Sequence, residues 1–270
     1  TAFGNLMSDM WRGQFNSISP EVFQSVLEKR YPAFTSTAQQ DAQEFLICVL
    51  NELHEALKNV RTQPCKKSCI SNAAASRECV SATSVITQLF EGQLTHDITC
   101  LKCMTTARRP ESFTVLSLPI PSRRPCSLQD CLKCFFQQDT LTCNNQVHCS
   151  WCGTKQDAAV KASITKAPQI IIFHLKRFEW QGDRRRKLST SISYPLSGLD
   201  LSPYSSPVFC PEAQYSLCAV ANHAGRVDNG HYTAFCKHSV TKNWYSFDDA
   251  MITKIRNSSV QTDRAYLLFY

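Results

Sequence analysis

Apolar side chains recur at helical spacing in the first sixty residues of the chain. Phe23, Val26 and Leu27 share one face of a short predicted helix. Ser19 and Pro20 mark its start, because serine is a favoured N-cap and proline fits the first helical position. The pattern therefore predicts a helix that begins at Pro20.

A longer helix is predicted to begin near Ser36, because Ser36 and Gln39 form a capping-box pattern. An apolar stripe then continues for about five turns. Its members are Ala42, Phe45, Leu46, Val49, Leu50, Leu53 and Leu57. Such a stripe is typical of a helix that lies on the core of a globular protein.

The helical periodicity is lost between residues 61 and 82, where cysteines, lysines and three consecutive alanines follow one another. A long aperiodic stretch of this kind is typical of a surface insertion, so no secondary structure is predicted for it. We interpret Cys65, Cys69 and Cys79 as loop thiols rather than as ligands of a second metal.

Alternating or short apolar runs, separated by turn residues, dominate the chain after residue 83. The predicted strands cover residues 89–100, 113–120, 169–178, 216–222, 231–237, 244–247 and 265–270. One helix interrupts them, from Ser127, its predicted N-cap, to about Thr140. The pattern thus predicts an α+β fold whose C-terminal two thirds are mainly β structure.

The composition of 43% hydrophobic and 19% charged residues, over 270 residues, excludes a disordered or fibrous chain. The net charge of +7 lies largely in the runs 65–68 and 184–187, which form no predicted face for nucleic acid. No stretch is long enough to span a bilayer, and no signal pattern opens the sequence. We expect a cytoplasmic or nuclear protein whose 15 cysteines stay reduced or bind metal.

Two Cys-x-x-Cys pairs lie in the strand-rich region, Cys100 with Cys103 and Cys149 with Cys152. Four thiolates in two such pairs are what a closed tetrahedral zinc site requires, and one structural zinc ion is therefore predicted. The alternative is four reduced, unligated cysteines. Cys131 and Cys134 also have this spacing, but they fall within the predicted helix, where we expect both to pack as small apolar residues.

The segments 230–235 and 244–249 read as two strands joined by a polar loop. A hairpin centred near residue 240 would place His231 opposite Asp248. In a catalytic triad an acid orients a histidine, and the histidine deprotonates the nucleophile. A structural hydrogen bond between His231 and Asp248 is the simpler interpretation. Gly230 would leave room for a substrate backbone, and we interpret the other histidines, including His223, as structural.

Gln40, Asp41 and Glu44 lie off the apolar stripe of the long predicted helix. Asp41 and Glu44 are neighbours at i and i+3, so their carboxylates could hold a cationic peptide together. The alternative is an ordinary solvated face of the helix.

Several of these segments are also recognisable as motifs. In chain order they are Gln39-Gln40-Asp41-Ala42-Gln43-Glu44-Phe45-Leu46, Phe90-x-Gly92, Leu175-Lys176-Arg177-Phe178, the histidine box from Gly230 and Tyr266-Leu-Leu-Phe-Tyr270. Together they resemble the ubiquitin-specific proteases, a papain-like family of deubiquitinating enzymes, over nearly the whole chain. The resemblance implies a single domain with a helical thumb (1–60), an insertion (61–82), zinc-tipped β fingers (83–165) and a β palm (166–270).

The resemblance also implies roles for the candidate residues. His231 would be the general base and Asp248 its orienting acid, and the four cysteines of the two pairs would be the zinc ligands. Gln40 and Gly230 would line the substrate site, where Asp41 and Glu44 would receive the arginines of the ubiquitin tail. Ubiquitin or a ubiquitinated protein is therefore the expected partner.

One family feature is missing from the sequence, the cysteine box of the type Gly-Asn-x-Cys, which would precede Thr1. Cys236 is five residues past His231 and so points to the other strand face, and Cys48 is in the middle of a predicted helix. We expect the chain to be a fragment that lacks its nucleophile and is inactive by itself. The alternatives are a pseudoenzyme that binds ubiquitin or another partner and, with little support, a zinc-stabilised nucleic-acid module.

Overall fold

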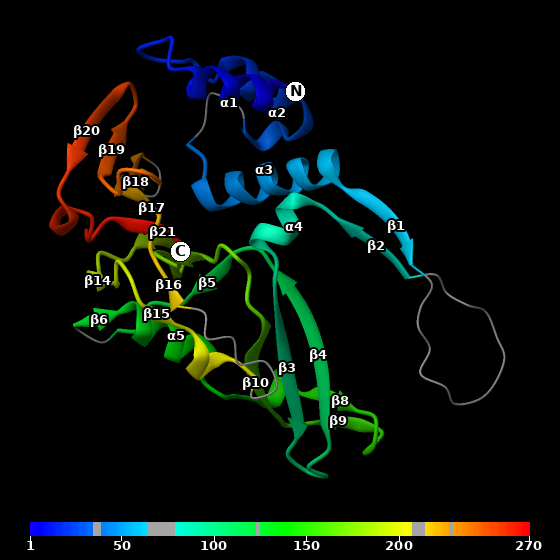
Figure 1. The fold of residues 1–270 in the computed structure, drawn as a ribbon. Helices are drawn as coiled ribbons and strands as arrows, with labels where there is room; N and C mark the ends of the chain where they lie inside the picture. Colours follow the sequence, from blue (N-terminus) through cyan, green and yellow to red (C-terminus); the bar gives the residue numbers. More distant parts are fainter. Residues whose placement is uncertain (35–38, 64–78, 123–124, 207–213, 227–228) are drawn as a thin grey trace.

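The computed structural model describes residues 1–34, 39–63, 79–122, 125–206, 214–226 and 229–270. Three parts follow one another from top to bottom in Figure 1. Helices α1 to α3 form the upper part, a twisted sheet the middle, and a ribbon of long strands projects below. None of the helices in the described ranges is long and apolar enough to cross a membrane.

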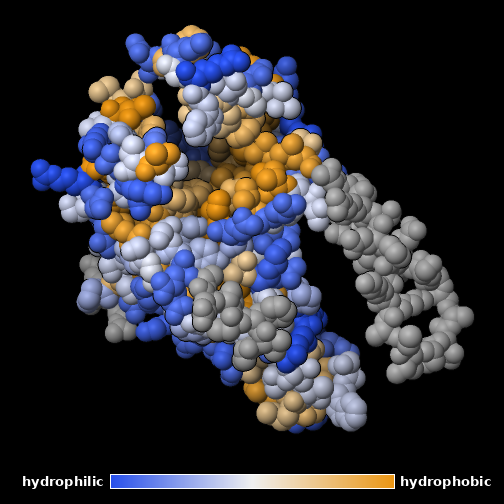
Figure 2. Space-filling model, viewed as in Figure 1, coloured by the Kyte–Doolittle hydropathy of each residue, from blue (hydrophilic) through white to orange (hydrophobic). Residues whose placement is uncertain are grey.

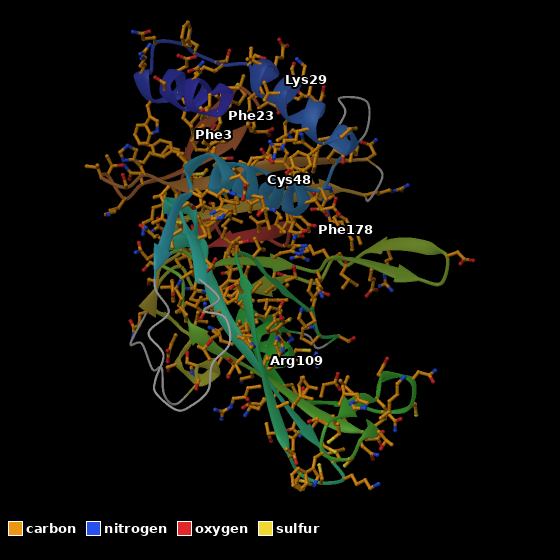
Figure 3. The ribbon with its side chains drawn as sticks, turned by 90° about the vertical axis from the view of Figure 1, so that its right-hand side faces the viewer. Phe3, Phe23, Lys29, Cys48, Arg109 and Phe178 are labelled. Atoms are coloured by element: carbon orange, nitrogen blue, oxygen red, sulfur yellow. The ribbon has the colours of Figure 1, made fainter. Side chains whose placement is uncertain are left out.

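The upper part contains α1 (Ala2–Arg12), α2 (Glu21–Arg30), a 3₁₀ turn (Pro32–Phe34) and α3 (Ala42–Leu57). Helix α1 was not predicted. It is capped at its start by the Thr1 side chain and ends at Gly13, whose φ of 64° is the left-handed conformation that glycine adopts readily. Phe3 of α1 and Phe23 of α2 face each other with ring centroids 5.6 Å apart (Figure 3).

The starts of α2 and α3 differ from the prediction. Pro20 is the N-cap of α2 rather than its first residue, and the Ser19 hydroxyl accepts a hydrogen bond from the Glu21 amide at 3.4 Å. Helix α3 begins at Ala42 with Asp41 as N-cap, well after Ser36, which lies outside the described residues. The carboxylate of Asp41 is a strong cap, so no capping box at Ser36 is needed to start the helix.

The apolar stripe of α3 packs in its central part. Leu50 is buried with Ile86 and Ile172 in a small apolar cluster, and Leu46 and Leu53 contact the cluster from the same helix. The stripe's outer members Phe45 and Leu57 are exposed. The C-terminal half of α3 is thus fixed to the sheet by apolar burial.

Three elements between residues 59 and 90 differ from the prediction. Helix α4 (Val85–Phe90) occupies the start of the predicted strand 89–100, and a capping box between Ser84 and Thr87 begins it. Strands β1 (Asn59–Gln63) and β2 (Cys79–Thr83) pair antiparallel at the two ends of the stretch for which no structure was predicted. Cys65 and Cys69 lie outside the described residues, and Cys79 begins β2.

The projecting ribbon is a four-stranded sheet in the order β4-β3-β10-β7 (Figure 1). Its strands are β4 (Thr106–Phe113), β3 (Gly92–Cys100), β10 (Ala158–Lys166) and β7 (Asp139–Leu141). The short hairpin of β8 (Val147–Cys149) and β9 (Thr154–Gln156) lies at its far end. This ribbon corresponds to the expected fingers.

The central sheet has seven strands in the order β20-β19-β18-β17-β21-β11-β5. They are β20 (Met251–Ile255), β19 (Trp244–Asp248), β18 (Gly230–Lys237), β17 (Ala219–Gly225), β21 (Ala265–Phe269), β11 (Ile172–Leu175) and β5 (Leu116–Leu118). All neighbours are antiparallel except β11 and β5.

Helix α5 (Leu128–Phe136) has Ser127 as N-cap, as predicted, and packs Leu128, Cys131 and Leu132 into the main core. Cys134 of the same helix is exposed, so the prediction of core packing is right for Cys131 and wrong for Cys134.

Three further two-stranded pairings complete the fold. They are formed by β12 (Phe178–Gln181) with β13 (Arg184–Lys187), β6 (Cys126–Ser127) with β14 (Ile192–Ser193) and β15 (Leu199–Asp200) with β16 (Gln214–Tyr215). Arg177, just before β12, is fully buried, and its guanidinium donates to the carbonyls of Leu188, Thr190 and Ala265. It therefore ties the start of the β12–β13 hairpin to β21.

Candidate functional site

His231 and Asp248 meet as predicted, although not through the predicted pairing. The recorded register places Ala234 opposite Phe247, and its continuation would bring Ala250 rather than Asp248 across from His231. The two side chains nevertheless touch, with His231 Nε2 and Asp248 Oδ1 2.7 Å apart. A diagonal contact of this kind remains within reach of long side chains on neighbouring strands.

The contact determines what the imidazole can do. Hydrogen bonding to Asp248 raises the pKa of His231, and Asp249 adds to the same effect. Because Nε2 is engaged by the carboxylate, Nδ1 is the ring nitrogen that can accept a proton from a nucleophile. Both side chains are about half exposed, at 49% and 56%, so solvent screens the charge interaction between them.

His231 lines a cleft of about 500 Å³ between the helical layer and the central sheet. Figure 2 shows a hollow with hydrophobic side chains in this place. The lining residues are Gln24, Leu27, Phe34, Gln39, Gln40, Asp41, Ala42, Phe45, Gly230, His231, Tyr232 and Asp249. The structure thus brings Gln40, Asp41 and Gly230 to the histidine, while Glu44 lies one turn along α3, exposed and outside this lining.

Gly230 is needed for a reason that the sequence did not reveal. A Cβ at this position would lie 2.1 Å from His223 Nε2 and 2.8 Å from the Ala224 carbonyl oxygen. From the sequence, Gly230 was expected to leave room for a substrate backbone. On the side where a Cβ would lie, however, that space is occupied by the buried ring of His223. A role of Gly230 in substrate binding stays a prediction that rests on its place in the cleft lining.

His223 belongs to a cluster of rings behind the cleft. Its ring centroid is 4.7 Å from that of Tyr232 and 5.2 Å from that of Phe178, and Tyr266 joins the cluster. Burial lowers the pKa of His223 to about 4, so the ring is neutral at physiological pH. Tyr232 and Tyr266 were not predicted as site residues, because nothing near them in the sequence indicates their contacts with α3.

The four predicted metal ligands come together at the tip of the fingers. Met104 N donates to the Cys100 carbonyl and Gly153 N to the Cys149 carbonyl, both at 2.9 Å. The residue after each pair is left-handed, with φ of 61° at Met104 and 69° at Gly153. The two pairs are therefore folded into the same kind of turn.

The sulfur positions suit a tetrahedral metal. All four Sγ atoms lie within 4.8 Å of one another, with Cys103 and Cys149 3.5 Å apart and Cys100 and Cys152 4.0 Å apart. A tetrahedron with zinc–sulfur bonds of 2.3 Å has sulfur–sulfur edges of about 3.8 Å. The Thr105 hydroxyl lies 3.2 Å from the Cys103 sulfur. This hydrogen bond is the main reason that the pKa of Cys103 is lowered to about 6, which favours a thiolate at Cys103.

No cysteine in the described ranges lines the cleft of His231. Burial raises the pKa of Cys236 and of Cys218, and the two thiols interact with each other. Burial also raises the pKa of Cys48, in the middle of α3 as expected. These environments oppose formation of the thiolate that a nucleophile requires.

Comparison with known proteins identifies the family. The profile described as ubiquitin carboxyl-terminal hydrolase matches residues 1–270. The chain belongs to the ubiquitin carboxyl-terminal hydrolase family. Its papain-like α+β fold, with helical thumb, β palm and β fingers, is the fold that the sequence motifs implied.

Relatives within the ubiquitin carboxyl-terminal hydrolase family extend beyond the matched region. The chain is 36% identical over 280 residues to ubiquitin carboxyl-terminal hydrolase 2 of Gallus gallus, covering 99% of this chain and 78% of that protein. It is 34% identical over 292 residues to ubiquitin carboxyl-terminal hydrolase 3 of Homo sapiens, covering 99% and 55%. The chain thus spans only about half the length of some relatives.

Solved structures of deubiquitinase modules have the same fold. The SAGA DUB module of Ubp8, Sgf11, Sus1 and Sgf73 bound to monoubiquitin matches with a TM-score of 0.75 and 29% identity, over 92% of this chain and 52% of that chain. The module of the same four proteins bound to ubiquitin aldehyde matches with a TM-score of 0.72 and 30% identity, over the same shares.

Proposed function

We propose that residues 1–270 form a ubiquitin-binding deubiquitinase domain that holds the C-terminal tail of ubiquitin in the cleft beside His231. The observation that carries this proposal is the 2.7 Å contact between His231 and Asp248 in a cleft also lined by Gln40 and Asp41. The similar modules bound to monoubiquitin and to ubiquitin aldehyde support it. Ubiquitin or a ubiquitinated protein is then the partner.

The proposed reaction of the protein to which this domain belongs is thiol-dependent hydrolysis of a ubiquitin isopeptide bond. His231 Nδ1 takes the proton of a cysteine thiol, and the thiolate attacks the carbonyl carbon of the ubiquitin C-terminus. The amine leaves with the proton from the imidazolium, and water then hydrolyses the thioester with the imidazole as base. Asp248 holds the ring in orientation through Nε2.

The nucleophile for this reaction is not among the described cysteines, since none lines the cleft. We therefore propose that these 270 residues bind ubiquitin without cutting it. The absence of a described cysteine from the cleft also favours a second candidate function, that of a pseudoenzyme that binds ubiquitin or another partner. The two functions differ in whether a cysteine from elsewhere in the protein reaches His231.

A fluorogenic amide of the ubiquitin C-terminus tests the proposal. Residues 1–270 should bind ubiquitin in a calorimetric titration and release no fluorophore. Turnover that is lost on His231→Ala but persists in Cys236→Ser would mean that another cysteine in the chain is the nucleophile. Failure of the folded chain to bind ubiquitin would overturn the proposed function.

We further propose that the four fingertip cysteines hold one structural zinc ion. The sulfur distances and the matched turns around Met104 and Gly153 support this assignment. When bound, zinc would fasten the end of β3 to the β8–β9 hairpin, and it would take no part in the reaction. The division into thumb, fingers and palm close to residues 60, 83 and 166 is part of the same proposal.

A further inference from the structure

Three large apolar side chains are exposed together at the tip of the fingers. Trp151 is 80% exposed, Met104 67% and Leu101 45%. All three lie in the turns of the two cysteine pairs, whose four Sγ atoms are within 4.8 Å of one another. Figure 2 shows hydrophobic side chains at this lower end of the molecule. A cluster of apolar side chains on a projecting end marks an interaction surface, whereas single exposed ones are ordinary.

The tip is also basic. Residues 98–110 and 140–156, which include the two turns and the strand ends beside them, contain Lys102, Arg108, Arg109 and Lys155 and no Asp or Glu. Four thiolates around the proposed zinc ion leave a net negative charge that is smaller than the positive charge of these side chains. The local charge therefore favours an acidic ligand at the tip.

A groove begins beside the first of these turns. Thr99 and Thr106 flank the turn and line a hollow of about 640 Å³ on one face of the finger sheet. Asp97, Arg108 and Lys161 line the same hollow and also a second one of about 990 Å³, which extends to α5. Because the two hollows share these three side chains, they form one continuous groove from the fingertip toward the palm.

The groove is basic as well. Among its described lining residues Asp97 is the acid, and its Oδ1 accepts from Arg108 Nε at 3.1 Å. Lys161 of β10 and Lys133 of α5 are exposed and form no salt bridge with another described residue. The rings of Phe136 and Tyr204 are stacked at the inner end, with centroids 5.0 Å apart. The groove thus offers two unpaired cations next to two aromatic rings.

A protein segment fits these features better than a membrane or a nucleic acid. A bilayer surface can cover a protruding tip, but it cannot enter a groove. Proteins that hold single-stranded nucleic acid stack successive bases on several aromatic side chains, whereas the tip exposes the ring of Trp151 beside the non-aromatic Leu101 and Met104. An extended peptide can place both apolar and charged side chains along a groove.

We propose that the fingertip and its groove dock an extended acidic segment of a partner protein. The apolar side chains of the segment pack on Trp151, Leu101 and Met104, and its carboxylates pair with Lys161 and Lys133. None of these five side chains lines the cleft that was assigned to the ubiquitin tail. The docking surface therefore goes beyond the proposed function, and a second protein can be held while ubiquitin occupies the cleft.

A displayed library of random peptides, each about twelve residues long, tests the class of segment. The folded chain of 270 residues should enrich peptides that combine Asp or Glu with Trp, Phe or Leu. A selected peptide should bind Trp151→Ala about tenfold more weakly, because buried aromatic side chains contribute much of the affinity of an interface. Lys161→Glu should weaken the same peptide by about threefold to tenfold, and added salt should reduce the difference.

Two matched variants control for the loss of an exposed ring and for the change in net charge. Trp11 of α1 is 86% exposed and Lys29 of α2 is exposed, and both lie in the thumb. Trp11→Ala and Lys29→Glu should bind the selected peptide normally. Because Trp151 and Lys161 are exposed, their variants should keep the thermal midpoint of the unaltered chain, which separates loss of docking from loss of fold.

Enrichment of peptides without acidic residues, or no enrichment at all, would overturn the proposal, as would equal weakening by Trp11→Ala. Binding to phosphatidylserine vesicles that is lost in Trp151→Ala would assign the tip to a membrane surface and would also overturn it. Competition between the selected peptides and ubiquitin would place the groove within the ubiquitin site and overturn independent docking. A chain that binds these peptides but no ubiquitin would support the docking surface and overturn only the proposed function.

Discussion

At Gly230 the backbone lies against the ring of His223, which leaves no space for a side chain. We expect Gly230→Ala to lower the free energy of unfolding by about 1–3 kcal/mol, as for other overpacked sites. Denaturant unfolding would measure the change. Adding His223→Ala should recover part of the loss, because the nearest clashing atom is His223 Nε2. Equal stability of Gly230→Ala and the unaltered chain would contradict the packing described here.

The pH dependence of His231 follows from its bond to Asp248. The pKa of His231 is raised in the folded chain, so the pair stabilises the fold fully below the unfolded pKa of about 6.5 and loses this contribution as pH rises through the folded pKa. Since both side chains are half exposed, the change in stability is small, and an NMR titration is the better measurement.

In that titration Asp248→Asn should lower the pKa of His231 toward its ordinary value, because a carboxylate is replaced by a neutral amide. Asp249→Asn should have a smaller effect, since Asp249 acts only through its charge. An unchanged His231 titration in Asp248→Asn would mean that the two side chains are apart in solution.

Among the elements, those with a local signal were predicted well. The strands of the histidine box end within a residue of the prediction, and Ser127 caps α5 as expected. Helix α4 was missed because six residues are too few to show a helical period. The start of α3 was misplaced because Ser36 and Asp41 are both favoured N-cap residues, and the prediction took the first whereas the helix begins after the second.

The same distinction holds for the candidate site. Sequence motifs identified His231, Asp248 and the four cysteines, whose side chains do come together. The motifs also contain Tyr232 and Tyr266, but neither was assigned to the site, because their hydrogen-bond partners are 190 and 225 positions away. The motif that holds Asp41 was visible in the sequence, whereas the partner of its carboxylate could be seen only in three dimensions.

The fingers give a prediction about metal. The folded chain should contain about one zinc ion, and Cys149→Ser should lose it, because removal of one thiolate opens a closed four-ligand site. Mass spectrometry under native conditions would count the metal, and hydrogen exchange should rise in β8 and β9. Cys134→Ser is the control, since that thiol is exposed and outside the cluster. Well-folded protein without metal would contradict the assignment.

On the scale of the whole molecule, the chain carries a net charge of +7, which does not favour a basic ligand. Charges more than about 8–10 Å apart are largely screened at physiological salt, so attraction of an arginine-containing tail must come from acids close to the cleft. The exposed acids available for this are Glu44, one turn along α3 from Asp41, and Asp249 in the cleft lining. Binding of ubiquitin should therefore depend on this local charge more than on the overall charge.

Glu44→Lys tests that dependence. It should weaken ubiquitin binding by about threefold to tenfold, the range for reversal of one exposed charge, and added salt should reduce the difference from the unaltered chain. Glu21→Lys changes the net charge equally at an exposed position outside the cleft lining and should bind normally. Equal weakening by both variants would show that overall charge governs binding. Weakening confined to Glu44→Lys would show that the local charge on α3 beside the cleft attracts the ligand.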